Sequence, residues 1–220
     1  MLNITNFCIF SRSDCINDLG VFLDSNLYLV KHIDHTVSKA MKMLGFIKRF
    51  GKEFKDLFVY KTLYNCYVRS NLEFASCAWS PFYEIHKKRI ESVQRNFTKF
   101  VMCSLYNLKY CDVPGYDVRC CVLDLQTLES RRDVTDCMFI VDVLNDRIKC
   151  NDVRELISMN DCSYNIRKPD MFRVPFHRTN YGLNEPITRC LRNANIMNRD
   201  VDLLKNRDQV KKSLLTLNSH

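Results

Sequence analysis

Positively charged side chains recur at helical spacing along residues 31–50. Among the residue patterns in this sequence, this one fits ligand binding best. At 3.6 residues per turn they share one face of a helix, opposite an apolar face. The positions on this face are Lys31, His35, Lys39, Lys42 and Arg49. A line of cations matches charge spread along a phosphate backbone better than it matches a small acidic ligand. We therefore expect this face to contact nucleic acid.

A second line of cations lies on the helix predicted over residues 83–105. Lys88, Arg95 and Lys99 align on a face separate from the apolar one. Two helices that each carry a basic line favour an extended contact with a phosphate backbone. The alternative is a solvated Lys/Arg face without a ligand, since exposed helix faces are often basic.

The sequence carries no recognisable catalytic constellation. Two-metal nucleotidyl transfer needs clustered carboxylates that hold Mg²⁺, and this chain has no Asp-Asp dipeptide. It also lacks a P-loop, a GxSxG motif, an HExxH motif and a glycine-rich dinucleotide turn. His32 and His35 stand on the basic side of a predicted helix, and we interpret them as solvated side chains. We therefore assign no catalytic residue and no metal ligand, and we expect no cofactor in this chain.

The chain has 12 cysteines, which raises the question of disulfides or zinc. No CxxC pair occurs, and Cys120-Cys121 are the sole adjacent cysteines. Closed zinc sites need tightly paired spacing, and neighbours on a chain rarely bridge. We interpret the cysteines as reduced thiols that pack as small hydrophobes. A zinc-dependent binding protein is kept as an alternative.

Composition favours a mainly α fold. A chain of 220 residues with 46% apolar residues can bury a sizeable core, and 5 Gly and 5 Pro are few for a β-sandwich. The sequence has no apolar run of about 18 residues that could span a membrane. Its N-terminus lacks the basic and apolar regions of a signal peptide. We expect an intracellular protein of the cytoplasm or nucleus, or both, without a membrane partner.

Three segments are predicted: an N-terminal β-hairpin remnant at 1–30, a helical bundle at 31–157, and an irregular basic segment with a C-terminal helix at 158–220. The hairpin pairs β-prone runs at 4–10 and 19–23 through a connection at 11–18. The expected helices cover 31–50, 53–78, 83–105, about 130–149 and about 200–217. Proline residues keep 158–186 mostly irregular. Residues 31–109 carry 15 basic and 6 acidic side chains, the charge footprint of a nucleic-acid-binding region.

Further expectations concern individual side chains. The apolar stripe of the first helix should comprise Ile33, Val37, Ala40, Met41, Leu44 and Ile47. Most aromatic residues of 53–78 should be core, among them Phe54, Phe58, Tyr60, Tyr64, Tyr67 and Phe74. The helix near 130–149 should have an outer face rich in Asp. Arg131 and Arg132 should find carboxylate partners such as Glu129, Asp133 or Asp136, or else a phosphate. A second basic patch is expected from Arg173, Arg178, Arg189 and Arg192.

Several motifs resemble those of one protein family. The first runs through Asp18-Leu19-Gly20-Val21, Asp24, Leu27, His32-Ile33, Lys39-Ala40 and Leu44-Gly45-Phe46-Ile47. Others are LYNCYVRSNLEFASCAWSP at 63–81, IESVQRNFTKF at 90–100, LESRRD at 128–133 and RVPFHRTNYGLNEPITRCLRNAN at 173–195. Together they resemble the region after the palm in reverse transcriptases of non-LTR retrotransposons, most closely the jockey-like branch. The resemblance extends over nearly the whole chain.

The resemblance implies a thumb and post-thumb fragment of an RNA-directed DNA polymerase that lacks the fingers and the catalytic palm. Leu19, Gly20 and Val21 match the family's element near the primer grip, where Gly20 would allow close backbone approach. The implied partners are an RNA/DNA template–primer duplex and the missing palm and fingers of the parent polymerase. Mg²⁺ would act only in the full-length parent enzyme, and this chain alone would be non-catalytic.

A rival hypothesis belongs to another class: a non-catalytic helical protein-interaction module whose basic residues serve solubility. It predicts an exposed apolar patch as the working surface and no salt-dependent affinity for nucleic acid.

Overall fold

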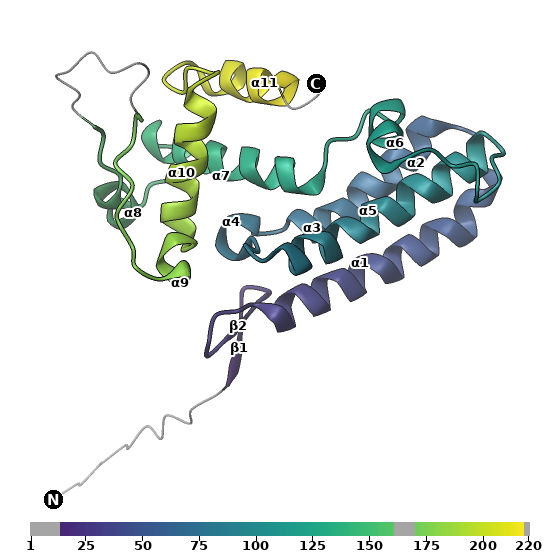
Figure 1. The fold of residues 1–220 in the computed structure, drawn as a ribbon, viewed down its shortest axis with the longest axis horizontal. Coiled ribbons are helices and arrows are strands. Elements are labelled where there is room, and N and C mark those ends of the chain that lie inside the picture. Colours follow the sequence, from purple (N-terminus) through teal and green to yellow (C-terminus); the bar gives the residue numbers. More distant parts are fainter. Residues whose placement is uncertain (1–13, 161–169, 218–220) are drawn as a thin grey trace, which may run out of the picture.

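A computed structural model describes residues 14–160 and 170–217, and it has the mainly α fold that was expected (Figure 1). An antiparallel hairpin of β1 (Cys15–Asp18) and β2 (Val21–Asp24) precedes the helices. The helical elements are α1 (Val30–Phe50), η1 (Gly51–Glu53), α2 (Leu57–Leu63), η2 (Tyr64–Arg69), α3 (Ser70–Glu73), α4 (Ser76–Trp79), α5 (Glu84–Leu105), α6 (Tyr116–Val122), α7 (Leu128–Leu144), α8 (Asn151–Leu156), α9 (Asn180–Leu183), α10 (Pro186–Asn198) and α11 (Arg207–Leu217).

The hairpin turns at Leu19 and Gly20, whose φ angles are 46° and 90°. Positive φ at both central residues gives a tight turn that matches the twist of the strands it joins. The connection expected at 11–18 is wrong in part, because Cys15–Asp18 form β1 and pair with β2. The β-prone run at 4–10 lies outside the described residues.

The first long helix, α1, buries the apolar stripe that its spacing predicts, with one exception. Ile33, Ala40 and Leu44 are fully buried, whereas Met41 is 40% exposed. Met41 lies at the edge of the stripe, where its sulfur accepts a hydrogen bond from the Asn96 amide of α5 at 4.0 Å. The prediction that Met41 lies in the core was therefore wrong, because α5 covers only one side of this side chain.

The second predicted helix, over 53–78, is broken. It consists of α2, the π-helix η2, α3 and, after Ala75 with a φ of 52°, the short α4. Four of its buried side chains follow one another at intervals of four residues: Tyr60, Tyr64, Val68 and Leu72. A π-helix bonds i to i+5, so each turn takes more residues and a four-residue spacing stays on one face. Aromatic residues off this stripe are exposed, so the core position expected for these four was wrong: Phe54, Phe58, Tyr67 and Phe74.

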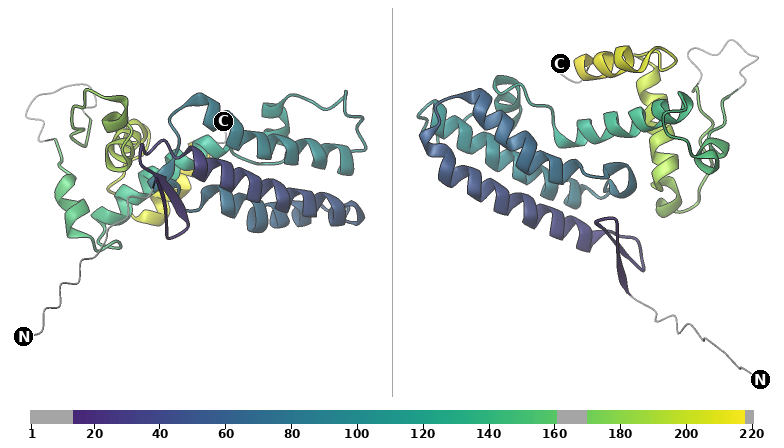
Figure 2. Two further views of the ribbon diagram at one scale, coloured as in Figure 1. Left: turned by 90° about the horizontal axis from the view of Figure 1, so that it is seen from below. Right: turned by 180° about the vertical axis from the view of Figure 1, so that it is seen from behind.

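Two apolar clusters form the core. One lies inside the bundle of α1, η2 and α5, and the other lies between α7, α10 and α11. The long helix α7 contributes Leu128 to the first cluster and Val134 to the second. Both views in Figure 2 show α7 leaving the bundle toward the C-terminal helices. Since α7 has side chains in both clusters, it connects the two halves of the described chain.

The C-terminal segment is more regular than expected, because α10 fills residues 186–198. Pro186 stands at the start of α10, where the missing N–H costs nothing, so it begins a helix instead of interrupting one. The Asp-rich face expected to point outward from α7 was also misplaced. Asp136 is fully buried against α10, and Asp142 pairs with Arg207 of α11.

In the described parts of the chain, each helix is either too short or too polar to cross a lipid bilayer.

Candidate nucleic-acid interface

The two helices that carry the predicted basic lines, α1 and α5, pack side by side and run parallel. Asp34 of α1 forms an ion pair with Arg89 of α5, and Met41 contacts Asn96 further along. Both pairs are separated by 55 residues, and the same offset at two points means that the helices run in the same direction. Asp34, Met41, Arg89 and Asn96 therefore mark the seam between the helices.

The order of side chains around each helix places both basic lines on the same side. In both helices the seam lies between the buried stripe and the cations, and the three faces follow one another in opposite rotational senses in α1 and α5, as parallel helices with facing seams require if their cations are to share one side. The seam of α1 faces the seam of α5, and the buried stripes of both helices face the same core. Both lines of cations therefore lie on the side of the helix pair that faces away from that core. Figure 1 views this side, with α1 and α5 in front of α2 and η2. We call its cations the basic face: Lys31, Lys39, Lys42, Arg49, Lys88, Arg95 and Lys99.

All seven predicted cations of the basic face lack a carboxylate partner within the described residues. Neighbouring cations on the same elements do have one: Lys87 pairs with Glu84 and Glu129, and Arg89 pairs with Asp34. Six of the seven side chains are exposed, and Lys99 is half-buried. The charge of the basic face is thus uncompensated and open to a ligand.

Two of these cations lie against tyrosine rings. The Lys99 ammonium lies 3.2 Å from the ring centre of Tyr110, and the Arg95 guanidinium lies 4.3 Å from that of Tyr116. Burial and the carboxylate of Glu91 raise the pKa of the Tyr116 phenol, which donates a hydrogen bond to Glu91. A neutral tyrosine keeps its ring face available to the cation. These contacts hold both side chains in place without neutralising them.

The primer-grip-like segment is brought next to α1 in part. Leu19 and Gly20 line an open groove of about 540 Å³ that Lys39 of α1 and Phe74, directly after α3, also line. Leu19 is 89% exposed at the hairpin tip. Val21, the third predicted residue of this segment, is buried in the core. The groove therefore joins the tip of the hairpin to the basic face, while Val21 serves packing.

His32 was expected to be solvated and is instead buried, because the hairpin packs over it. Its Nδ1 accepts a hydrogen bond from the Phe22 backbone N–H at 3.3 Å, which requires that nitrogen to be unprotonated. Its Nε2 can then donate to the Thr36 hydroxyl at 3.4 Å. Burial, followed by the neighbouring His35, lowers the pKa of His32. His32 is thus a neutral residue that fixes the hairpin on α1, and it was misread as part of the basic side.

Sequence reasoning missed two aromatic side chains beside the basic face. The rings of Phe46 and Phe50 lie 4.5 Å apart, and the side chains are 46% and 58% exposed. By helical spacing Phe46 falls between Lys42 and Arg49 on the outer side of α1. Their i, i+4 spacing outside the apolar stripe is the sequence signal that could have identified them. Exposed aromatic rings among cations suit the stacking of unpaired bases.

Two of the four arginines expected to form a second basic patch in the C-terminal segment are used inside the fold, while Arg173 and Arg178 are exposed. Arg189 is buried against Asp136, and Arg192 donates to the Leu183 carbonyl and to Asn184. Both guanidinium groups serve internal contacts, so they are not available to a phosphate backbone.

The arginine pair at the start of α7 also faces inward. Arg131 pairs with Glu73 of α3, not with one of the acidic residues proposed for it. Arg132 is almost fully buried, and its Nη1 and Nη2 have no hydrogen-bond partner among the described residues. Burial lowers the pKa of Arg132, although Glu91 and Glu129 oppose this effect.

Within residues 14–160 and 170–217, no three His, Cys, Asp or Glu side chains are grouped so that they could hold a metal ion. No model of a protein family matches the chain, and neither a curated protein nor a solved structure is significantly similar to it.

Proposed function

We propose that this chain binds the backbone of a template–primer duplex, as the thumb-like part of a reverse transcriptase from a non-LTR retrotransposon. The observation that carries the proposal is the set of seven uncompensated cations on one side of α1 and α5. The motif resemblance described above supplies the family. On this proposal the chain acts on nucleic acid in the cytoplasm or nucleus and is non-catalytic by itself.

The dimensions of the basic face suit a polynucleotide. Lys31 and Arg49 stand 18 positions apart on α1, which is roughly 27 Å at 1.5 Å per residue. Phosphates of one duplex strand are spaced about 3.4 Å apart along the axis, so the face spans roughly eight of them. Contacts of this kind position a duplex and do not select its sequence.

The groove at the hairpin tip would take the end of the primer strand. Gly20 has no side chain between the backbone and the groove, and Lys39, which also lines the groove, supplies a positive charge. Asn71 of α3 adds a polar side chain to the same groove. The described residues offer no carboxylate cluster for the Mg²⁺ of the parent polymerase, so we assign no catalytic step to this chain.

A second candidate function, protein interaction, is favoured by the aromatic residues that proved to be exposed. Phe58 and Phe74 present large apolar surfaces on α2 and next to α3. Such surfaces mark protein contacts when they are contiguous. This candidate differs from the first because its affinity would not depend on the basic face.

Binding to a labelled RNA–DNA hybrid, measured by fluorescence anisotropy between about 50 and 200 mM salt, separates the two candidates. We expect affinity to fall steeply with salt. The variant Lys42→Ala/Arg49→Ala/Lys88→Ala should weaken binding. It should also reduce the slope of log affinity against log salt by roughly 0.9 for each phosphate that is no longer neutralised.

The matched control is Lys149→Ala/Lys205→Ala/Lys212→Ala, which removes the same charge from exposed positions elsewhere. If both triple variants weaken binding equally, net charge and not the basic face drives association. Salt-independent binding by the folded wild-type chain would contradict the proposed function.

A further inference from the structure

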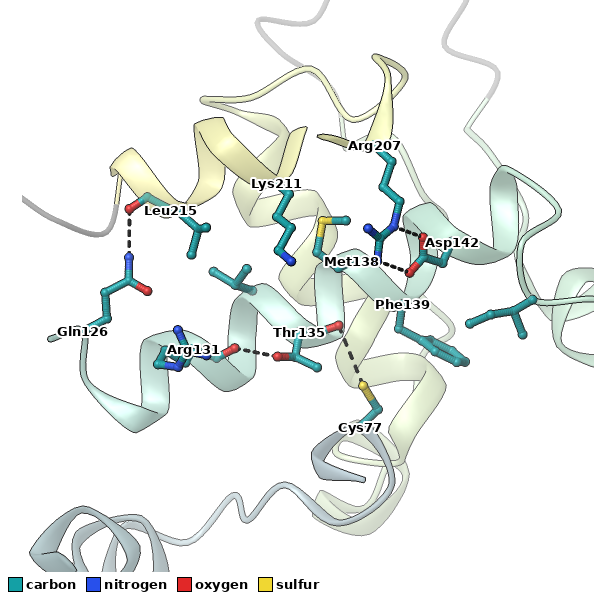
Figure 3. A pocket seen from close by; sticks show the side chains of 12 residues that line it. Cys77, Gln126, Arg131, Thr135, Met138, Phe139, Asp142, Arg207, Lys211 and Leu215 are labelled. Carbon is teal, nitrogen blue, oxygen red and sulfur yellow. Dashed lines mark hydrogen bonds and ion pairs between the residues drawn. The ribbon is translucent and has the colours of Figure 1, made fainter. Parts of the chain in front are cut away.

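A pocket of about 520 Å³ opens between α7 and α11 (Figure 3). None of the seven cations of the basic face lines it. Its volume lies within the range of about 300–1,000 Å³ that is typical of sites for small molecules. The pocket therefore has the size of a ligand site, and its chemistry can be considered independently of nucleic-acid binding.

The floor of the pocket is apolar. Val134, Met138 and Phe139 of α7 line it, and Leu215 of α11 faces them from the other side. Figure 3 shows α11 lying across α7, so these side chains meet between the two helices. An apolar floor of this kind favours a flat hydrophobic group over a fully solvated ion.

One positive charge in the pocket is uncompensated. The Arg207 guanidinium is held by Asp142, with Nη2 at 3.1 Å from Oδ2, and Arg131 is held by Glu73. Lys211 has no carboxylate partner in the part of the chain that the structure describes. In Figure 3 its amine points from α11 toward α7. The pocket therefore offers a single free ammonium group to an anion.

A hydrogen-bond acceptor in the pocket is also unused. The Gln126 amide nitrogen donates to the Leu215 carbonyl at 2.8 Å, and this contact fixes which way the amide group points. Its Oε1 is then buried without a donor among the described residues. A buried acceptor without a donor costs free energy, so a ligand with an N–H or O–H group would remove that cost.

We propose that this pocket binds a small aromatic anion: a ring with an N–H group and a carboxylate or phosphate arm. The ring lies on the apolar floor, the anionic arm pairs with Lys211, and the ring N–H donates to Gln126 Oε1. Indolic acids and nucleotides share this chemistry. The inference does not rest on the proposed function, because the residues that carry it lie outside the basic face.

Calorimetric titration of the full chain with indole-3-propionate and, separately, with guanosine monophosphate distinguishes the two sources. We expect saturable binding of indole-3-propionate, and binding of guanosine monophosphate in addition would show that the site also accepts a nucleotide. Lys211→Ala should weaken that binding roughly tenfold, since it removes a hydrogen bond to a charged group. Lys212→Ala is the matched control, because its side chain is exposed and does not line the pocket.

A methylated probe tests the contact with Gln126. Wild-type protein should bind indole-3-propionate about fivefold more tightly than its N-methyl analogue, which has no N–H to donate. In Gln126→Met, this preference should vanish. The proposal is overturned if folded wild-type protein does not bind indole-3-propionate, if Lys211→Ala and Lys212→Ala behave alike, or if the N-methyl analogue binds wild-type protein equally well.

Discussion

Arg189 and Asp136 form an ion pair inside the interface between α10 and α7, with Arg189 Nε 2.9 Å from Asp136 Oδ2. The two side chains are 8% and 1% exposed. Arg189 also donates to the backbone carbonyl of Cys77, and Asn193 donates to Asp136. One buried pair thus ties α4, α7 and α10 together. Its charges are satisfied only while both partners are present.

Removing one partner of this pair should destabilise the chain strongly. Asp136→Ala leaves the Arg189 charge buried without a counter-ion, and we expect a loss of about 3 kcal/mol in the free energy of unfolding. Arg154→Ala breaks an exposed pair with Asp146 and should cost less than about 0.5 kcal/mol. Urea denaturation measures the loss of unfolding free energy in both variants. Equal losses would show that the buried pair contributes no more to stability than the exposed pair. The double variant Asp136→Leu/Arg189→Met should lose less stability than Asp136→Ala, since no unpaired charge remains.

Asp133 should make stability depend on pH between about 4 and 6. Burial raises its pKa to about 6, and repulsion from Asp136 and Glu129 adds to the shift. The folded pKa lies above the unfolded value of about 3.9. The folded state therefore favours the protonated carboxyl of Asp133. The contribution of this group to the free energy of unfolding is fully present below about pH 4 and is lost as the pH rises through about 6.

Asp133→Asn removes the cost of ionising this buried group. We expect it to raise the free energy of unfolding at pH 7 by on the order of 2 kcal/mol and to change it little at pH 4. The new side chain can still accept the hydrogen bond that Asn193 donates at 3.1 Å. Denaturation curves at the two pH values measure the difference. An effect of the same size at both would show that ionisation of Asp133 is not its cause.

The long helices could be predicted from the sequence because their evidence is local. Both α1 and α5 have uninterrupted apolar stripes, and they end within one residue of the expected boundaries. The cations of the basic face were predictable for the same reason.

Features that depend on distant contacts could not be predicted. His32 is buried by the hairpin, and a helical projection does not show which part of the chain will cover a position. The partners Asp136 and Arg189 are 53 residues apart, so their charges looked like two separate solvated faces. The π-helix η2 shifts the phase of the second helix in a way that a fixed period of 3.6 cannot represent.

Asp34 offers a test of the basic face by gain of affinity, which unfolding cannot imitate. It neutralises Arg89 at the seam between α1 and α5, and both side chains are about half exposed. Asp34→Asn removes the negative charge and frees Arg89 for a phosphate. We expect tighter binding to the RNA–DNA hybrid and a salt dependence steeper by roughly 0.9. Anisotropy titrations with Asp152→Asn, an exposed change on α8, supply the control. Equal gains in the two variants would indicate a general effect of net charge.

The exposed ring pair Phe46 and Phe50 predicts a preference for duplexes with a single-stranded overhang. Unpaired bases can stack on exposed aromatic rings, with a contribution of about 1–3 kcal/mol per base, whereas paired bases inside a duplex cannot reach them. Phe46→Leu/Phe50→Leu should therefore weaken binding of an overhang-bearing hybrid about tenfold and leave a blunt hybrid unaffected. Phe58→Leu changes another exposed phenylalanine, on α2, and should alter neither. Equal losses on both hybrids would mean that the rings support the shape of α1 instead of stacking on bases. No loss on either would show that the ring pair does not stack on bases.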